Sequence, residues 1–296
     1  MKVTIGIPFF NPGKFIFDSI KSILLQTYSD FELILIDDGS TDDSLTLAKS
    51  FSDDRVTVVS DGLNLGLPAR LNQVIQLAKG DYIARMDADD LVSLDRIKKQ
   101  VDFLNSNLDV DLVSTGICSI SNDCKVLSTR IPSIDKTLDL SVEDGIKGRT
   151  EIAHATIMAR KSWCDRNPYD ESAKLMEDYQ LWIDSLIRND LKVGFIPEPL
   201  YFYREESSIQ YKKVIQAYKN QIKVVFCKYR DSISLNTLIE FYLQISAKKL
   251  ITHLLNVMGV MNKLILVRNR ATVQDPKWTV FVNNEIHKIK SDKGTL

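Results

Sequence analysis

Residues 80–90 read GDYIARMDADD and predict a buried strand that ends in a cluster of acidic side chains. Tyr82 to Met86 is a short apolar run typical of a strand, and three aspartates follow it. Residues two apart in an extended segment point to the same side, so Asp87 and Asp89 bring two carboxylates together. Such a pair suits a hard divalent cation, which can also hold a diphosphate. The alternative is a solvated acidic turn before a helix.

Outward from this stretch, apolar runs typical of strands alternate with amphipathic runs typical of helices. We expect strands at Val3–Ile7, Leu33–Ile36, Val56–Val59, Tyr82–Met86 and Val110–Thr115. We expect helices at Phe15–Leu25, from Ser40 or Thr41 to Ser52, at Ala69–Ala78, and from a cap at Ser93 to Asn105. This order predicts an α/β fold, a Rossmann-like, mostly parallel sheet with helices on both faces.

Polar clusters follow three of these strands. Ligands bind such sheets beyond the carboxyl ends of the strands, so Pro8–Asn11, Asp37–Ser40 and Asp87–Asp90 are expected along one edge. Asp37 can accept hydrogen bonds from a ribose or a base, and Gly39 permits a tight turn. Turn formation and helix capping are the alternative for this second cluster.

Beyond Thr115 the pattern is less regular. We expect a strand at Ala155–Arg160, a helix at Asp178–Asn189, and short strands at Val193–Ile196 and Tyr201–Tyr203. Only one residue of the Glu177–Asp178 pair is expected to face a site, because adjacent helical residues do not share a face. The alternative is a preference of acidic residues for a helix N-terminus.

Composition excludes several function classes. The 296 residues include 38 Lys and Arg against 39 Asp and Glu, which argues against wholesale nucleic-acid binding. The four cysteines form no C-x-x-C pair and there are three histidines, so neither a structural zinc site nor a disulfide framework is expected. Scattered cysteines fit a reducing, cytoplasmic compartment. The start MKVTIGIPFFN reads as a strand, not a signal peptide.

Together these blocks resemble the family 2 glycosyltransferases, whose fold is called GT-A. The resemblance runs from Val3 to about Ser208 through seven blocks in order. They are IPFFN at Ile7–Asn11, SIKSILLQTYSDFELILIDDGSTDDS from Ser19, NLGLPARLN from Asn64, GDYIARMDADD from Gly80, HATIMARK from His154, EDYQLW from Glu177 and EPLYFYR from Glu198.

The resemblance implies an inverting transfer of a hexose, glucose or galactose, from a UDP-sugar, with Mn²⁺ or Mg²⁺ as cofactor. It implies that Asp89, with Asp87, binds the metal through a DxD motif and that Asp178 is the catalytic base. The nucleotide would contact Pro8, Phe10, Asn11, Asp37, Asp38, Asn64, Arg70 and Asp87. Asp90, His154 and Glu177 would lie near the acceptor or the donor sugar, and Arg204 near the phosphates.

Two of these roles have structural alternatives, and one position departs from the family. Arg70 can instead pair with an Asp, and His154 can instead be a packed core residue. Many relatives have a His shortly after the YR pair, where this chain reads YREESSIQ with Glu205 and Glu206. The ligands of the metal beyond Asp89 therefore stay open.

The resemblance also divides the chain. Residues 1–208 are expected to form the catalytic domain, with a nucleotide-binding half at 1–116 and an acceptor-binding half at 117–208. Residues 209–296 are expected to form a helical C-terminal region, basic from about Tyr211 and partly disordered from about Ala271. An apolar stripe at Leu250, Leu254, Val257, Met261 and Leu264 lies beside basic residues. Such a helix can lie on an anionic membrane, or else pack on the catalytic domain.

Because many relatives elongate lipid-linked glycans, we expect a polyprenyl-diphosphate-linked saccharide as acceptor, in O-antigen or capsule synthesis. The expected place is then the cytoplasmic face of the inner membrane, as a peripheral protein. One rival is a sugar nucleotidyltransferase, which needs a Gly-rich, Arg-containing loop where this chain has PFFNPGK. The other is a non-catalytic nucleotide-sugar-binding protein, for which Asp178 would be dispensable.

Overall fold

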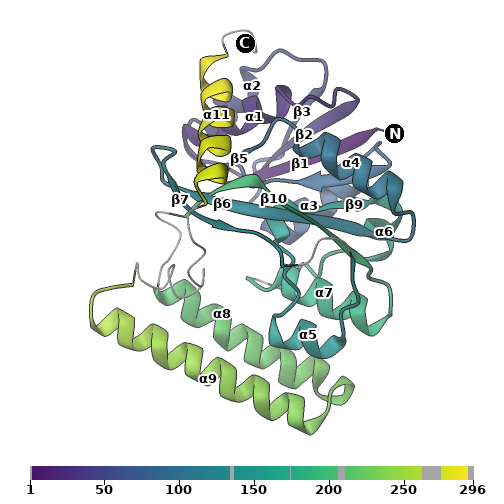
Figure 1. The fold of residues 1–296 in the computed structure, drawn as a ribbon, viewed down its shortest axis with the longest axis vertical. Helices are drawn as coiled ribbons and strands as arrows, with labels where there is room; N and C mark the ends of the chain where they lie inside the picture. The colour runs from purple at the N-terminus through teal and green to yellow at the C-terminus, as the bar shows by residue number, and fades with distance from the viewer. Residues whose placement is uncertain (1, 134–136, 174, 206–210, 262–274, 293–296) are drawn as a thin grey trace.

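Alternating apolar residues in the first strands build the two faces of the central sheet. In β2 (Phe31–Asp37), Leu33 and Leu35 pack into one apolar cluster, while Ile34 and Ile36 pack into another on the opposite face. This period of two is what a strand buried on both faces requires. The computed structural model shown in Figure 1 describes residues 2–133, 137–173, 175–205, 211–261 and 275–292.

Ten strands form one sheet in the described part of the chain, in the order β3-β2-β1-β4-β9-β6-β10-β5, with β7 and β8 beside β6 and β10. The other strands are β1 (Val3–Phe9), β3 (Val56–Ser60), β4 (Tyr82–Arg85), β5 (Leu91–Val92), β6 (Leu112–Ile120), β7 (Val126–Arg130), β8 (Thr137–Leu138), β9 (Met158–Arg160) and β10 (Val193–Arg204). The first four strands pair in parallel, as do β6 and β10, while β9 joins the two groups antiparallel to both.

Helices cover both faces of the sheet, which confirms the predicted fold class. On one face lie α1 (Phe15–Leu24), α2 (Ser44–Lys49) and α4 (Arg96–Ser106). On the other lie α3 (Leu67–Leu77), α6 (Lys161–Arg166) and α7 (Glu177–Ile187), packed through Val74, Trp163 and Trp182. Amphipathic helices on a two-sided sheet leave only its strand ends open for a ligand.

Three predicted element boundaries are wrong for local physical reasons. The second helix begins at Ser44 because Ser40 and Thr41 donate their backbone N–H groups to Asp37 and Asn11 instead of capping it. Ser93 does not cap α4, because the helix begins at Arg96 and Asp95 occupies the capping position; the Ser93 hydroxyl donates to Glu285 and accepts from the Asp95 amide. The two short strands expected after Val193 are one strand, whose pairing with β6 shifts register around Pro199.

The C-terminal region consists of a helical hairpin and a returning helix. The hairpin contains α8 (Tyr211–Val224), a π-helical turn at Val225–Tyr229, a 3₁₀ turn at Arg230–Ser232 and α9 (Leu235–Val257). It packs on α5 (Val142–Lys147) and α7, below the sheet in Figure 1. The predicted stripe ends early, because α9 stops at Val257 before Gly259, whose φ is 68°. Leu264 lies outside the described residues.

The last described segment folds back onto the catalytic part. Helix α11 (Pro276–Ser291) packs Val282 and Ile286 against Phe202 and Leu91 of the sheet. Its Glu285 accepts from the Ser93 hydroxyl and the Leu94 amide at 3.0 and 2.8 Å. The expectation of partial disorder from Ala271 is therefore wrong for these sixteen residues. No helix in the described ranges has the length and apolarity needed to cross a bilayer.

Candidate active site

The three polar clusters lie side by side at the carboxyl ends of β2, β1 and β4. Phe9 pairs with Asp37 across β1 and β2, and the Asp38 amide donates to the Phe9 carbonyl at 2.8 Å. On the other side of β1, Met86 donates to Gly6 at 3.2 Å, which places Asp87 next along the same edge. The sheet topology thus brings together the segments that the sequence singled out.

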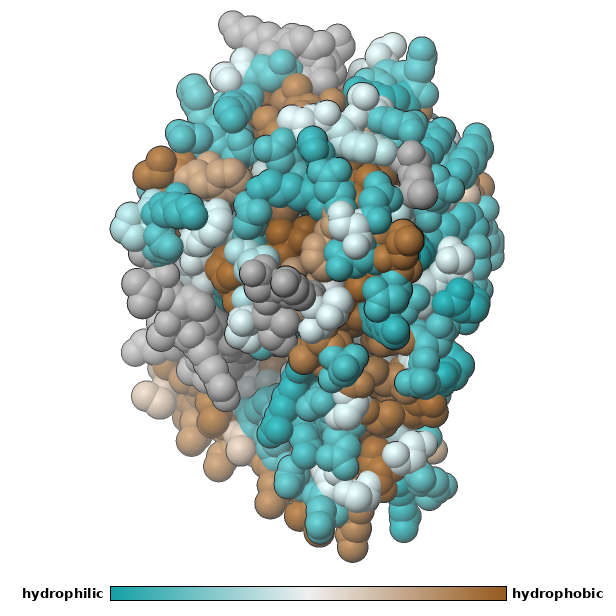
Figure 2. All heavy atoms as spheres, turned by 45° about the vertical axis from the view of Figure 1, so that its right-hand side comes forward, coloured by the Kyte–Doolittle hydropathy of each residue, from teal (hydrophilic) through white to brown (hydrophobic). Residues whose placement is uncertain are grey.

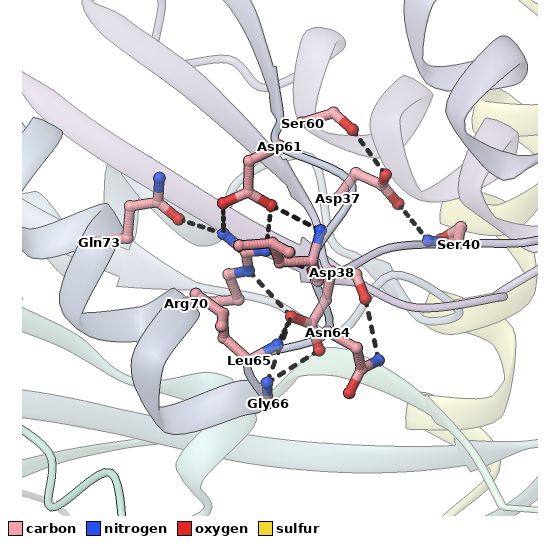
Figure 3. A network of polar contacts seen from close by, with 11 residues as sticks. Asp37, Asp38, Ser40, Ser60, Asp61, Asn64, Leu65, Gly66, Arg70 and Gln73 are labelled. Carbon is pink, nitrogen blue, oxygen red and sulfur yellow. Dashed lines mark hydrogen bonds and ion pairs between the residues drawn. The ribbon is translucent and has the colours of Figure 1, made fainter.

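The loop after β3 is held by a buried ion-pair network around Arg70 (Figure 3). The guanidinium, 1% exposed, donates to Asp38, to both oxygens of Asp61, to Gln73 and to the Leu63 carbonyl. These five bonds use all of its N–H groups. Arg70 therefore has no spare donor for a nucleotide in this arrangement. Its predicted nucleotide contact is not favoured, whereas the Asp pairing that the sequence left open is present.

Asp38 completes this network from the strand side. Its carboxylate accepts from the amides of Leu65 and Gly66, and its carbonyl accepts from the Asn64 side chain at 2.9 Å. Asp37, also predicted to contact the nucleotide, is buried and accepts from the Ser40 amide at 2.9 Å and the Ser60 hydroxyl at 2.8 Å. A ribose or base that donates a hydrogen bond to Asp37 would have to displace the Ser60 hydroxyl from this carboxylate.

The remaining predicted nucleotide residues differ in exposure. Pro8 is buried within β1, whereas Phe10 is 52% exposed and offers a free aromatic face. The exposed Asn11 has a φ of 51°, and its side chain accepts from the Thr41 amide at 2.7 Å. Asn11 therefore ties the β1 end to the β2 loop. Phe10 is the member of this group best placed to stack on a base.

The acidic loop after β4 is clamped from α1 and β10. The Ser19 hydroxyl lies 2.8 Å from the Ala88 carbonyl and 2.6 Å from the Asp90 carbonyl, and its single hydrogen is shared between them. The Asp90 carboxylate accepts from the Tyr201 hydroxyl and the Arg204 amide. With both oxygens bound and 1% exposure, Asp90 is out of reach of a sugar hydroxyl unless the loop moves. Its predicted sugar contact is not favoured by this geometry.

Arg204 is the second clamp on the loop. Its guanidinium donates to the carbonyls of Asp89, Ser121 and Asn122 and stacks on the Phe15 ring at 4.6 Å. These contacts bury Arg204 and leave its predicted phosphate contact without support from the geometry. The next residue, Glu205, pairs with Arg130 at 2.7 Å and accepts from the Ser119 hydroxyl. The family resemblance leads one to expect a His shortly after Arg204, and this chain has Glu205 and Glu206 there.

Asp87 is oriented by a chain of buried side chains. Arg85 forms an ion pair with Asp87 and donates to His154 Nδ1 at 2.8 Å, and His154 Nε2 lies 2.7 Å from the Tyr169 hydroxyl. An Arg only donates, so Nδ1 accepts and Nε2 carries the hydrogen toward Tyr169. Burial, followed by the Arg85 charge, lowers the pKa of His154 well below its usual value. His154 is thus a neutral, packed residue that positions Arg85.

A cleft of about 880 Å³ lies beside the Asp87–Arg85–His154 side chains, and segments distant in sequence line it. Asp87, His154, Glu177 and Asp178 all line it, although they come from the β4 end, the segment before β9 and the start of α7. Its size suits a drug-sized or sugar-nucleotide ligand. Arg130, Tyr203 and Glu205 also line it.

Asp178 and Glu177 occupy the first turn of α7. Burial raises the pKa of both carboxyls above its ordinary value, although Asp178 accepts from the Tyr179 amide at 2.7 Å. A carboxylate with a raised pKa in a cleft is the usual form of a general base. Both members of the pair reach the cavity, so the expectation that only one faces the site is wrong.

Asp87 and Asp89 are the two carboxylates of this loop that keep access to solvent, as a divalent cation shared with a ligand would require. The Asp87 side chain is 31% exposed and Asp89 is more open, forming no ion pair with any described side chain. Partial burial and the negative charge of Asp87 raise the pKa of Asp89. A bound cation would relieve the repulsion between these two carboxylates. No group of three His, Cys, Asp or Glu in the described ranges forms a closed metal site. The remaining ligands would be oxygens of a diphosphate.

Sequence reasoning missed the residues that support the site. Tyr201 donates to Asp90 and accepts from the Asp87 amide at 3.0 Å, and Tyr169 holds His154. Arg96 is fully buried and donates to the Arg85 carbonyl. The partners of Tyr169 and Tyr201 are remote in sequence, and only Tyr201 carries a local signal, as a polar residue in the largely apolar run PLYFY.

Comparisons with known proteins agree with one family. The family model described as Glycosyl transferase family 2 matches residues 4–164. The "Putative glycosyltransferase EpsE" of Bacillus subtilis (strain 168) is 36% identical over 70% of this chain and 74% of its own. The "Uncharacterized glycosyltransferase MJ1057" of Methanocaldococcus jannaschii is 29% identical over 70% of this chain and 72% of its own.

Solved structures show the same fold at low identity. TarS 1-349 of S. aureus superposes with a TM-score of 0.60 at 14% identity, over 98% of this chain and 89% of its own. The mannosyltransferase PcManGT from Pyrobaculum calidifontis, in complex with GDP-Man and Mn²⁺, gives a TM-score of 0.59 at 14% identity, over 98% and 87%.

Proposed function

Because the chain belongs to glycosyl transferase family 2, we propose that it transfers one hexose from a UDP-sugar, with inversion, to a lipid-linked glycan of O-antigen or capsule synthesis. Its fold is GT-A and it is a glycosyltransferase. The observation that carries the specific proposal is that Asp87 and Asp178 line the same cleft. Glucose or galactose is the proposed sugar.

The proposed chemistry is a one-step displacement at the anomeric carbon. The acceptor hydroxyl attacks while Asp178 takes its proton, and the bond to the nucleoside diphosphate breaks on the opposite face. The raised pKa of Asp178 keeps its proton affinity closer to what this transfer needs. Neighbouring Glu177 is proposed to orient the acceptor. No covalent sugar intermediate forms.

We propose that the diphosphate is held at the acidic loop when its bond to the sugar breaks. Bound Mn²⁺ or Mg²⁺ would neutralise its growing negative charge. Asp89 and Asp87 would hold the cation from the protein side, and Arg85 fixes the orientation of Asp87. A neighbour with the same fold carries Mn²⁺ with GDP-Man, and another is titled in complex with UDP-GlcNAc, which supports a sugar-nucleotide donor.

The raised pKa of Asp178 predicts an acid limb in the pH profile. The base acts only when it is ionised, so kcat/KM falls as the pH drops through its pKa. Since that pKa is raised, the fall begins above the range of an ordinary Asp, near 3.9. Initial rates from about pH 4 to about pH 8, with circular dichroism at each pH, test this. A flat profile down to the ordinary range contradicts it.

Loss of His154 is expected to weaken catalysis without touching the reacting atoms. His154→Ala frees Arg85 and loosens Asp87, which we expect to lower kcat about tenfold to a hundredfold, as for other residues that orient ligands. His154→Gln restores an acceptor for Arg85 and should recover part of the rate. The half-saturating Mn²⁺ concentration should rise in the Ala variant. An unchanged metal dependence would mean that the effect is structural.

The outward face of α9 supports the proposed peripheral membrane contact. Leu235, Leu243, Leu250, Leu254 and Val257 are exposed there, opposite the buried Phe241 and Ile245. Residues 211–258 carry eight Lys and Arg against two Asp and Glu, in a chain of net charge −1. Figure 2 shows apolar residues gathered along the bottom of the molecule, over this hairpin. An apolar face with basic flanks suits an anionic bilayer.

Vesicle binding measures this contact. We expect co-sedimentation with vesicles containing phosphatidylglycerol, little with pure phosphatidylcholine, and loss of binding in Leu243→Glu/Leu250→Glu. The matched control is Leu108→Glu, at an exposed leucine remote from the hairpin. Equal binding of the hairpin variant and the control rules out this surface.

A donor screen tests the proposed function. UDP-glucose, UDP-galactose, UDP-GlcNAc and GDP-mannose are each incubated with the protein in Mn²⁺, Mg²⁺ or EDTA, and release of the nucleoside diphosphate is measured. The proposal predicts turnover of UDP-glucose or UDP-galactose that EDTA abolishes. Turnover of GDP-mannose alone would correct the donor. Turnover of none would contradict the proposed activity.

A further inference from the structure

A second cavity adjoins the cleft and is not used by the chemistry proposed above. It measures about 970 Å³ and lies between the Asn64–Pro68 loop, residues 170–173 and 175–177, and the inner side of α8 and the π-helical turn. Glu177 and Leu67 line both cavities, so the two share a wall at Glu177, the residue before the proposed base Asp178. A space directly beside the reacting position can hold the part of a substrate that does not react.

Four amide side chains contribute to the polar lining of this groove. Asn64, Gln180, Gln216 and Asn220 all face it, and Gln216 donates to Asn220 at 2.8 Å. An amide offers both donors and acceptors, as sugar hydroxyls do. Leu65, Leu67, Pro68 and Met176 add apolar surface, which suits the carbon faces of sugar rings.

The charges of the groove nearly balance. Lys223 and Lys228 face Asp170, Glu171 and Glu177, and Lys228 already pairs with Asp184 at 2.7 Å. Such a lining does not select a strongly anionic or cationic ligand. A neutral saccharide is the ligand that fits its polar and apolar parts together.

The helical hairpin forms one wall of the groove, because its lining residues lie on one face of the helix. Gln216, Asn220, Lys223 and Cys227 recur at helical spacing and so share one face. The π-helical turn at Val225–Tyr229 continues this wall, and such turns are frequent at functional sites. Tyr229 anchors the turn by donating to Asp184 at 2.9 Å.

We propose that this groove binds the neutral sugars of the acceptor glycan that precede the reacting hydroxyl, so that the C-terminal hairpin selects acceptors longer than one sugar. The inference rests on the proposed glycosyl transfer. It adds that α8 and the π-helical turn determine which acceptor lengths are bound. The rate of UDP-sugar hydrolysis does not depend on these two elements.

Cys227 offers a direct probe, because it lines the groove and is exposed, while the other three cysteines are buried. Fluorescein maleimide on Cys227 is expected to occupy the groove and to leave the cleft free, since Cys227 lines only the groove. We expect labelled protein to hydrolyse the UDP-sugar within about twofold of the unlabelled rate, yet to lose about tenfold or more in kcat/KM for a trisaccharide acceptor. Cys227→Ser should make the protein insensitive to the reagent.

The acceptors are p-nitrophenyl mono-, di- and trisaccharides of glucose, galactose and GlcNAc. The proposal predicts that the di- or trisaccharides exceed the monosaccharides about tenfold in kcat/KM. Asn220→Ala should raise the KM of the trisaccharide about threefold to tenfold, the effect of one lost hydrogen bond, with kcat unchanged. Lys219→Ala, on the same helix but outside the groove, is the matched control.

The outcomes separate the two proposals. Donor hydrolysis that survives labelling while trisaccharide transfer falls supports the groove. Equal transfer before and after labelling, a preference for monosaccharides, or hydrolysis with no saccharide accepted overturns the groove and leaves the glycosyltransferase in place. Absence of hydrolysis in unlabelled protein overturns both.

Discussion

Asp178→Asn is expected to lower the rate of glycosyl transfer about a thousandfold while donor affinity stays unchanged. The side chain lines the cleft at the first turn of α7, and its substitution removes the proton acceptor without changing its size. General-base groups contribute about 10² to 10⁴ in rate, and a thousandfold corresponds to about 4 kcal/mol in the barrier. Transfer rates and UDP affinity by calorimetry measure the two effects separately.

Glu177→Gln is the matched control, since it neutralises the adjacent carboxyl in the same cleft. We expect a loss of about tenfold or less, mainly through acceptor KM. A larger loss in Glu177→Gln than in Asp178→Asn would exchange their roles. Near wild-type transfer by Asp178→Asn would show that Asp178 is not the catalytic base. If Asp178 is dispensable, the hypothesis of a non-catalytic nucleotide-sugar-binding protein is favoured again.

Asp89→Asn is expected to lower kcat about a hundredfold to a thousandfold, the usual cost of removing one group that stabilises developing charge. The side chain is open to solvent and forms no ion pair with any described residue, so the fold should be unaffected. The half-saturating Mn²⁺ concentration should rise in parallel. A titration of activity against Mn²⁺, from EDTA-treated protein, measures both.

Asp54→Asn is the control for this variant, because Asp54 is an exposed carboxyl outside the cleft. Its activity and metal dependence should equal those of the wild type. If Asp89→Asn keeps the wild-type response to Mn²⁺, the cation is held elsewhere. Full activity in EDTA would mean that the diphosphate leaves without a metal.

The layout of the nucleotide half could be predicted because its signals are local. Short β-branched runs ending in Pro8, Asp37 and Asp87 mark three strands, and parallel pairing then places their ends together. The prediction of Asp178 beside Asp87 came only through family resemblance. Nothing in the spacing of residues 91 positions apart fixes that they share a cleft.

The supporting residues could not be predicted for the same reason. Tyr201 bonds the Asp87 amide 114 positions away, and Tyr169 reaches Arg85 only through His154. Helix α11 was missed because its buried face is narrow, with Val282, Ile286 and Ile289 among polar residues. For Arg70 the sequence left two roles open, and only the fold shows that its guanidinium pairs with Asp38 and Asp61.

The anomeric configuration of the product tests the central claim most directly. Proton NMR of the product formed from an α-linked UDP-hexose gives the coupling constant of its anomeric hydrogen. A single attack assisted by Asp178, on the face opposite the departing diphosphate, predicts a β-linked sugar. An α-linked product would require two displacements or attack from the leaving-group side, and would contradict the account.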